Sequence, residues 1–376
     1  MTTSTHGHCE PRFDRVREAF ELNLSGESQV GARITVIQED ELVVDLWGGY
    51  RTEAKTDPWD EHTLVCCMSV TKGVVALAAH LLAERGKLDY DAPVARYWPE
   101  FGAAGKEAIT VRQAMSHQAS LAFLDAAEPG DANHWDVMIR KIGAQAPNWP
   151  VATDECYHSV TIGYITGELV RRIDGRPIEQ FIREELVEPL GSDYVLGCQD
   201  EHLPRVVKQI PNPSNELMNG GLFNERSVGM FAPFPADPEF IGSEAALRSV
   251  FPSGGGVASA NGIARLFAPF ANGGTFQGVS LYSPAIIARA CEEQWHHNDS
   301  VFGNEFRVAL GLLLHCGFND WGREGNVGTA GAGGYAAFAD PSNRIAYGFT
   351  PNKYTTGAGL GEEHGRLVEA LYGCLN

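Results

Sequence analysis

The sequence predicts an α+β (α/β) protein in which an antiparallel sheet is flanked by helices and carries an inserted, mainly helical domain. Strand patterns occur near both ends of the 376-residue chain, whereas helical periodicity and long loops fill its middle. The chain is also too long for one simple core. We therefore predict a discontinuous α/β sheet domain formed by residues 1–75 and 250–376. Residues 76–249 are predicted to form the inserted helical domain.

The N-terminal part is predicted to contain a helix, a hairpin and a second helix. Residues 11–24 place apolar side chains at helical spacing, and residues 32–37 and 42–47 resemble two strands with a turn at Gln38–Glu41. An apolar segment then leads into a helix that ends at Gly86. The core stripe of this helix consists of Val70, Val74, Leu77 and Leu81.

The middle of the chain is predicted to be helical with long connections. Residues 110–116 begin with a threonine cap, and residues 159–174 form a clear amphipathic pattern. A further helix over residues 178–187 is expected to stop before Pro189. Residues 203–250 are rich in Pro, Gly, Asn and Phe without a clean period. We interpret them as an irregular segment that contributes to a substrate pocket.

The C-terminal part is predicted to alternate helices with strands. The helices are expected at residues 260–270, 284–293 and 362–372. The strands are expected at residues 306–314, 335–339 and 345–351. Asp340-Pro341-Ser342-Asn343 has the composition of a turn and would join the last two strands.

Composition narrows the class of partner. The formal net charge of −19 disfavours binding to nucleic acid or to anionic membranes, and no basic patch is visible. No apolar run is long enough to cross a bilayer. The first residues contain neither a basic start nor an apolar segment typical of a secretory signal. We therefore expect a cytoplasmic protein that acts on a small molecule.

The cysteines do not suggest a metal site or a disulfide framework. None of the eight belongs to a C-x-x-C pair, and no His/Cys spacing matches zinc. Free buried thiols are the expected state, although a catalytic cysteine without a base nearby in sequence stays an alternative. The run His296-His297-Asn298-Asp299 is interpreted as a solvated loop rather than a metal site. No cofactor is implied.

Ser69-Val70-Thr71-Lys72 is the most informative motif. Three residues make almost one helical turn, so the serine hydroxyl and the lysine amine lie on one face of the predicted helix. A desolvated lysine can lose its proton near neutral pH and then deprotonate the serine. The motif therefore predicts a nucleophile with its own base.

Acyl transfer needs a second proton-handling group and donors for the oxyanion. Tyr157 is a candidate for the first, with a packed aromatic as the alternative, and His158 is either a base or a packing residue. The run Gly328–Gly334 could bring backbone N–H donors close to a substrate. A flexible loop or a phosphate cradle is the alternative, but no helix follows and no Walker pattern is present.

The order of these motifs resembles the serine β-lactamase and penicillin-binding superfamily, and most closely its class C-like carboxylesterase (family VIII esterase) branch. The similarity runs from about residue 13 to 370. Further segments that fit are Gly86–Val94, Thr110–His117, Glu188–Gly191 and Ser253–Val257.

The resemblance implies roles for individual residues. Ser69 would be acylated, Lys72 would serve as base or proton relay, and Tyr157 would be the second acid and base. Backbone N–H groups of Ser69 and Ala332 would form the oxyanion hole. Substrate contacts would come from His158, Ser159, Thr329 and Gly331. Two positions depart from the β-lactamase pattern, because Ser159 replaces a common asparagine and Thr329 replaces a lysine.

The leading hypothesis is a serine hydrolase that cleaves small-molecule esters through an acyl-enzyme, with weak or no β-lactamase activity. Without a lysine at position 329, a β-lactam carboxylate would lose a charge-assisted hydrogen bond worth roughly 1.5–3 kcal/mol. One alternative is a transacylase that passes the acyl group to an amine or alcohol in a dry apolar site. Another is a non-catalytic binding protein of the same fold. The sequence leaves open whether Lys72 or Tyr157 is the general base.

The apolar site of the transacylase would be built from aromatic residues of the helical insert. These are Phe123, Trp135, Trp149, Phe223, Phe231 and Phe234.

Overall fold

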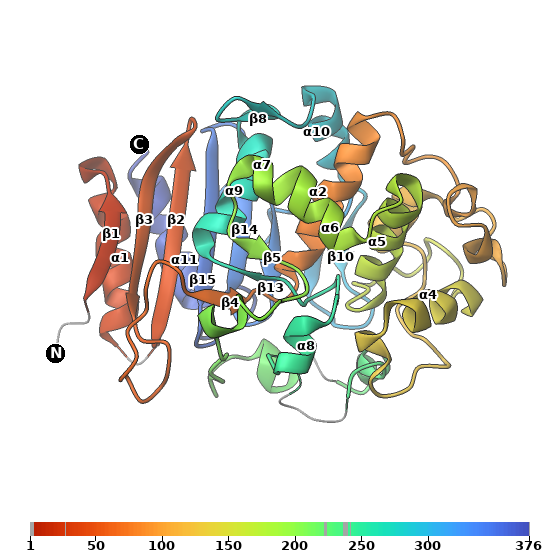
Figure 1. Cartoon of the computed structure of the whole chain (residues 1–376), viewed down its shortest axis with the longest axis horizontal. Helices are drawn as coiled ribbons and strands as arrows, with labels where there is room; N and C mark the ends of the chain where they lie inside the picture. Colours follow the sequence, from red (N-terminus) through yellow and green to blue (C-terminus); the bar gives the residue numbers. More distant parts are fainter. Residues whose placement is uncertain (1–3, 27, 222–223, 236–239, 241, 376) are drawn as a thin grey trace.

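A nine-stranded antiparallel sheet forms the centre of the computed structural model, which describes residues 4–26, 28–221, 224–235, 240 and 242–375 (Figure 1). The strand order within these residues is β1-β3-β2-β15-β14-β13-β12-β11-β10. Strands from the two ends of the sequence lie side by side, because β2 pairs with β15. The strands are β1 (Thr5–Cys9), β2 (Gly31–Gln38), β3 (Glu41–Gly49), β10 (Trp295–Asn298), β11 (Glu305–Val308), β12 (Leu313–Leu314), β13 (Val327–Gly331), β14 (Tyr335–Asp340) and β15 (Ile345–Pro351).

Helices cover both faces of the sheet (Figure 1). The helices α1 (Asp14–Ser25) and α11 (Gly361–Gly373) pack on one face, and α2 (Val70–Glu84) and α9 (Ala260–Ala271) pack on the other. Both faces of strand β14 are apolar because each face packs against helices. Side chains alternate between the two faces along a strand. Phe338 belongs to the core under α1 and α11, whereas its neighbour Ala339 belongs to the core under α2 and α9.

The residues between α2 and α9 form short helices joined by long connections and lie at the end of the molecule away from the termini (Figure 1). Their helices are α3 (Val111–Met115), α4 (Trp135–Ala144), α5 (Thr161–Asp174), α6 (Ile178–Ile182), α7 (Glu188–Leu190) and α8 (Glu244–Arg248), and α10 (Pro284–Ala290) follows α9. A small sheet, β5-β7-β4-β6, lies among them. Its strands are β4 (Leu64–Cys66), β5 (Tyr194–Val195), β6 (Val206–Val207) and β7 (Val257–Ala258). A separate pair consists of β8 (Thr275–Phe276) and β9 (Val279–Ser280).

Helix α2 joins the two parts of the molecule. It contacts β13 of the large sheet and α5 of the helical part. Consequently every residue from Val70 to Leu82 is buried, and not only the predicted stripe. The first turn of α2, which carries the Ser-x-x-Lys motif, therefore lies where the sheet meets the helical part. The division into domains at residues 75/76 and 249/250 stays a prediction.

Several predicted boundaries differ from the structure. Residues 306–314 form two strands, β11 and β12, because the chain turns at Ala309–Leu312 with Gly311 at φ 71°. Pro189 does not end its helix. It lies in the first turn of α7, where a missing N–H costs little, and Gly191 in the left-handed conformation ends the helix instead.

The helix predicted at residues 284–293 is shorter in the structure, where α10 ends at Ala290. Within the ranges described above, no helix is both long and apolar enough to span a bilayer.

Candidate active site

The Ser69 hydroxyl lies at the start of α2, directly after a sharp turn of the chain. Strand β4 ends at Cys66, Met68 takes the left-handed conformation with φ 50°, and α2 begins at Val70. Such strain in a non-glycine residue is often found at functional sites. The turn places Ser69 at the N-terminus of α2, where the helix dipole favours negative charge on its oxygen. Ser69 is partly exposed, whereas its neighbours in the turn are buried.

Lys72 approaches Ser69 from the next turn of the same helix, as the spacing predicts. Its Nζ is 2.8 Å from Ser69 Oγ and donates to the carbonyl oxygen of Ser253 at 2.6 Å. Only 7% of Lys72 is exposed to solvent. Burial lowers the pKa of this amine from 10.5 to about 7, because a charged ammonium loses its hydration there. A large fraction of Lys72 is therefore neutral at physiological pH and can accept a proton.

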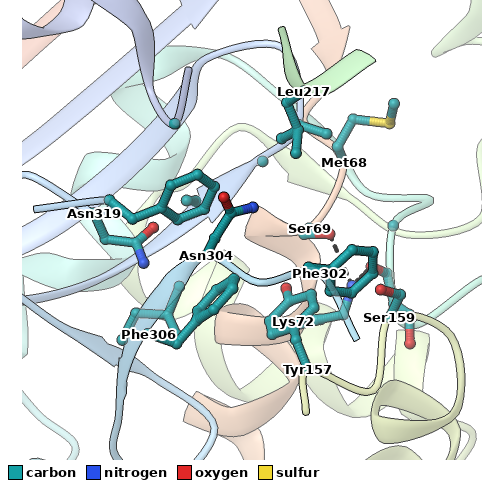
Figure 2. A pocket seen from close by; sticks show the side chains of 18 of the residues that line it. Met68, Ser69, Lys72, Tyr157, Ser159, Leu217, Phe302, Asn304, Phe306 and Asn319 are labelled. Atoms are coloured by element: carbon teal, nitrogen blue, oxygen red, sulfur yellow. Dashed lines mark hydrogen bonds between the residues drawn. The ribbon is translucent and has the colours of Figure 1, made fainter. Parts of the chain in front are cut away.

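Tyr157 joins this pair from the loop before α5. Lys72 Nζ lies 5.1 Å from the centroid of the tyrosine ring, and Figure 2 shows Ser69, Lys72 and Tyr157 grouped at the cavity wall. Withdrawal from water raises the pKa of the Tyr157 phenol well above its ordinary value, and the Ser69 hydroxyl offsets only part of this rise. The phenol therefore stays protonated at neutral pH.

Two backbone amides at the cavity have no hydrogen-bond partner among the described residues. They belong to Ser69 and Ala332, which both line the cavity. Gly331 brings them together, since a Cβ on this residue would lie 2.4 Å from the carbonyl oxygen of Cys67. The Gly-rich run thus forms most of strand β13 and the turn after it. The absent side chain of Gly331 lets that strand approach the Ser69 turn.

The cavity in front of Ser69 is partly open to solvent, and its lining is mainly apolar. One wall comes from the irregular segment, which contributes Leu217, Phe231 and Phe234, and Figure 2 shows the opposite wall around Phe302 and Phe306. Lys72 is the one basic side chain among the described lining residues. Further aromatic and polar lining residues include Phe251, Phe318, Asn304 and Asn319.

The remaining aromatic residues of the insert take other places. Phe123 and Trp149 pack edge to face in a small cluster of their own, and Trp135 packs against Tyr164. Phe223 lies outside the described residues. Two of the six predicted residues therefore line the cavity.

Comparison with known proteins identifies the family to which this fold belongs. Residues 17–371 match the protein family described as Beta-lactamase, and this match spans most of the chain. The chain belongs to the beta-lactamase family. The predicted superfamily and fold class are thereby confirmed.

Relatives within and around this family are similar over nearly their whole length. The chain is 32% identical over 361 residues to Esterase/beta-lactamase LipL of Mycobacterium tuberculosis, covering 92% of this chain and 82% of LipL. A penicillin-binding protein homologue from Caulobacter crescentus superimposes with a TM-score of 0.91 and 35% identity, covering 99% of this chain and 100% of that one. A family VIII carboxylesterase gives the same TM-score and coverage at 32% identity.

Two of the predicted substrate contacts line the cavity, and two do not. Ser159 and Gly331 line the cavity, and the Ser159 hydroxyl is buried without a hydrogen-bond partner among the described residues. His158 is turned away, since its Nε2 accepts from the Leu121 amide and its Nδ1 donates to the Cys156 carbonyl. We therefore expect His158 to hold the backbone rather than substrate.

Thr329 supports the nucleophile from behind instead of facing the cavity. Its hydroxyl donates to the backbone carbonyl of Ser69 at 3.3 Å. Its side chain fills the space above Gly73, where an added Cβ would lie 2.7 Å from Thr329 Cβ. Thr329 thus couples β13 to the first turn of α2.

This contact gives a testable prediction. Gly73→Ala would force α2 away from β13, because real Cβ atoms essentially never approach a neighbour within 3.0 Å. We expect a loss of about 1–3 kcal/mol in unfolding free energy, which is typical of overpacking, together with reduced kcat. Thermal unfolding and ester hydrolysis would measure both effects.

Two further variants show whether the clash is the cause. Gly365→Ala in α11, where an added Cβ meets no atom within 4 Å, should be neutral or slightly stabilising. Adding Thr329→Gly to Gly73→Ala should restore stability. An undisturbed Gly73→Ala variant would contradict the tight contact between α2 and β13.

The cysteines and histidines outside this group do not compete for the chemistry. All eight cysteines are free, and five of them are buried. Burial raises the pKa of the Cys66 thiol to about 11, which makes a thiolate nucleophile unfavourable. His296 contacts Glu305, and His297 contacts Glu155. In the described ranges, no three His, Cys, Asp or Glu side chains gather as metal ligands.

Sequence reasoning missed several residues that shape the site. His117 stacks on Tyr157, and Asp299 binds the backbone amide of Tyr157. Asn304, Phe302 and Phe306 enter the cavity from the segment around β11 (Figure 2). One signal was available for His117, since it is the last residue of Thr110–His117, a segment that supports the resemblance. The distance between His117 and Tyr157 in the sequence gives no hint of their contact.

Proposed function

We propose that this protein hydrolyses small-molecule carboxylic esters through an acyl-enzyme on Ser69. The observation that carries the proposal is the 2.8 Å contact between Ser69 Oγ and a Lys72 amine whose pKa is about 7, at the wall of an apolar cavity. Relatives named as esterase and carboxylesterase support the same reaction class.

The pKa directions favour Lys72 as the general base in the free enzyme. Neutral Lys72 takes the Ser69 proton as Oγ bonds to the substrate carbonyl carbon, and the carbonyl electron pair moves onto oxygen. The N–H groups of Ser69 and Ala332 would stabilise that oxyanion. On collapse, the bond to the leaving alkoxide breaks and the Tyr157 phenol protonates the alkoxide. Protonated Lys72 then returns a proton to Tyr157, and water hydrolyses the acyl-enzyme.

Incubation with a fluorophosphonate followed by peptide mass spectrometry tests the nucleophile directly. Ser69 is expected to gain the phosphonyl mass, and short p-nitrophenyl esters are expected to be hydrolysed. An unlabelled Ser69 would instead support the non-catalytic alternative. Adding graded concentrations of an amine separates hydrolysis from acyl transfer, since a transacylase would yield amide at the expense of acid.

The cavity composition predicts a preference for neutral esters. We expect p-nitrophenyl methyl succinate to exceed mono-p-nitrophenyl succinate by at least about tenfold in kcat/KM at pH 8, where Lys72 is mostly neutral. A buried carboxylate without a charged partner forgoes roughly 1.5–3 kcal/mol, and about 1.4 kcal/mol is tenfold. The two esters differ only in the methyl group that removes the charge.

The same argument applies to β-lactams, which carry a carboxylate. We propose weak or no β-lactamase activity, measurable with a chromogenic cephalosporin. Equal rates on the two succinates, or fast cephalosporin hydrolysis, would show that a cation does reach the bound carboxylate.

A further inference from the structure

The ring of Tyr157 stacks with two other aromatic rings. His117 stacks on it with ring centroids 4.5 Å apart and planes 29° apart. Phe306 also stacks on it, with centroids 5.2 Å apart and planes 14° apart. Lys72 Nζ lies 5.1 Å from the centroid of the same ring. The phenol is thus fixed by two planar contacts in addition to its own torsions.

The backbone around Tyr157 is fixed by two further side chains. The buried carboxylate of Asp299 accepts hydrogen bonds from the amide groups of Tyr157, Val301 and Phe302. His117 Nδ1 accepts from the amide of His158 at 2.9 Å. His117 therefore holds both the ring of Tyr157 and the residue that follows it.

The structure maintains His117 in an unusual conformation. Its φ is 64°, in the left-handed region that non-glycine residues seldom adopt. Only 3% of the residue is exposed. Neighbouring contacts fix this corner, since Trp295 Nε1 donates to the Ser116 carbonyl and the Gly311 amide donates to the Met115 carbonyl. Strain of this kind persists only where surrounding contacts over-determine it.

His117 is uncharged in this setting. An Nδ1 that accepts a hydrogen bond carries no proton, so the neutral ring has its proton on Nε2. The titratable groups around it are Tyr157, His158 and Lys72, and Asp299 lies on the far side of the Tyr157 loop. Burial, followed by the neighbouring His158 and Lys72, lowers the pKa of His117 well below its ordinary value.

We propose that His117 is a positioning residue whose neutral ring clamps Tyr157 against Phe306 and keeps water away from Lys72. It does not line the described cavity, so it acts through Tyr157 and not on the substrate. This inference rests on the proposed roles of Ser69 and Lys72. It adds a residue that positions Tyr157 and keeps Lys72 dry.

Two substitutions separate the ring from the hydrogen bond. His117→Asn keeps an acceptor near the position of Nδ1 and tolerates positive φ, but it removes the stacked ring. His117→Phe keeps a ring but leaves the His158 amide without its acceptor. The readout is the pH dependence of Ser69 phosphonylation by a fluorophosphonate, in which the Ser69 Oγ–P bond forms, fluoride leaves and Lys72 takes the proton.

We expect His117→Asn to unfold within a few degrees of wild type but to react at least tenfold more slowly at pH 7. The acid limb of its pH–rate profile for phosphonylation should move to higher pH by half a unit or more, because water beside Lys72 favours the charged ammonium form. His117→Phe should keep the wild-type limb while losing thermal stability. Ester hydrolysis by His117→Asn should show a lower kcat with little change in KM.

If Ser69 phosphonylation in His117→Asn has the wild-type rate and the wild-type pH dependence, the proposal is wrong. This variant is sufficient for the test if His117→Phe does not fold. A slow rate and a shifted limb in His117→Phe, with His117→Asn like wild type, would assign the role to the hydrogen bond and contradict a clamp by the ring. Phosphonylation does not require an ester substrate. A protein that is labelled at Ser69 but cleaves no ester would refute the proposed function and still report on His117.

Discussion

Replacing Ser69 by alanine is expected to abolish both ester hydrolysis and fluorophosphonate labelling. The variant removes the one oxygen that lies 2.8 Å from Lys72 Nζ at the cavity wall. Loss of the nucleophile in a serine hydrolase costs roughly 10⁴- to 10⁶-fold in kcat. The fold should survive, because Lys72 keeps its hydrogen bond to the Ser253 carbonyl and no cavity larger than one hydroxyl is created.

Ser280→Ala is the matched control, since this exposed serine lies on β9 away from the cavity. It should retain wild-type turnover and labelling. Both variants should unfold within a few degrees of wild type in a thermal melt. Hydrolysis by Ser69→Ala within tenfold of wild type, or phosphonylation of another residue, would refute the assignment.

The spacing of Ser69 and Lys72 could be interpreted from sequence because a helix imposes its own geometry. Residues three apart lie on one face wherever the helix is placed, and the Lys72 contact follows from that rule. The hairpin of β2 and β3 was predictable for the same reason. Its register pairs Gln38 with Glu41 across the turn, and short-range patterns determine such turns.

Long-range packing was not available in the same way. Strand β13 escaped prediction because its composition, Val327-Gly328-Thr329-Ala330-Gly331, lacks the bulky residues of a typical strand. Its glycines are required by tertiary contacts, since a Cβ on Gly328 would lie 2.5 Å from the Ala337 carbonyl. Strand β10 was interpreted as a loop because His296, His297 and Asn298 face solvent on an edge strand.

The site residues also fall into those that a local motif predicts and those that only long-range packing brings together. The residues identified from motifs carry the proposed chemistry, whereas those that position them come from distant segments. His117 and Asp299 lie 40 and 142 residues from Tyr157, as their separation in sequence and their hydrogen bonds show. Nothing in a single sequence relates positions so far apart, because only folding brings them together.

Lys72→Met should remove the proton acceptor while filling nearly the same space. We expect kcat to fall roughly 10²- to 10⁴-fold, the usual range for a general base. Wild-type kcat/KM should rise with pH through a limb near 7, where the buried amine loses its proton, and the limb should be absent from the variant. Lys72→Arg is the matched control, because it keeps a long cationic side chain that cannot act as a base. It should be as inactive as Lys72→Met.

The same residue should make folding stability depend on pH. The folded pKa of Lys72, about 7, lies below its ordinary value of 10.5, so between these values the unfolded chain binds one more proton. Stability therefore rises with pH across this window, and the penalty for the buried charge is fully present below pH 7. Its size is on the order of 5 kcal/mol at 1.36 kcal/mol per pKa unit.

Lys72→Met should accordingly be more stable than wild type at pH 6, and this advantage should shrink towards pH 10. Urea unfolding at several pH values measures the difference directly. A constant difference across that range would mean that Lys72 keeps an ordinary pKa in the folded protein. The amine would then be protonated at neutral pH and unable to activate Ser69, so the catalytic and thermodynamic experiments test one and the same property of this buried group.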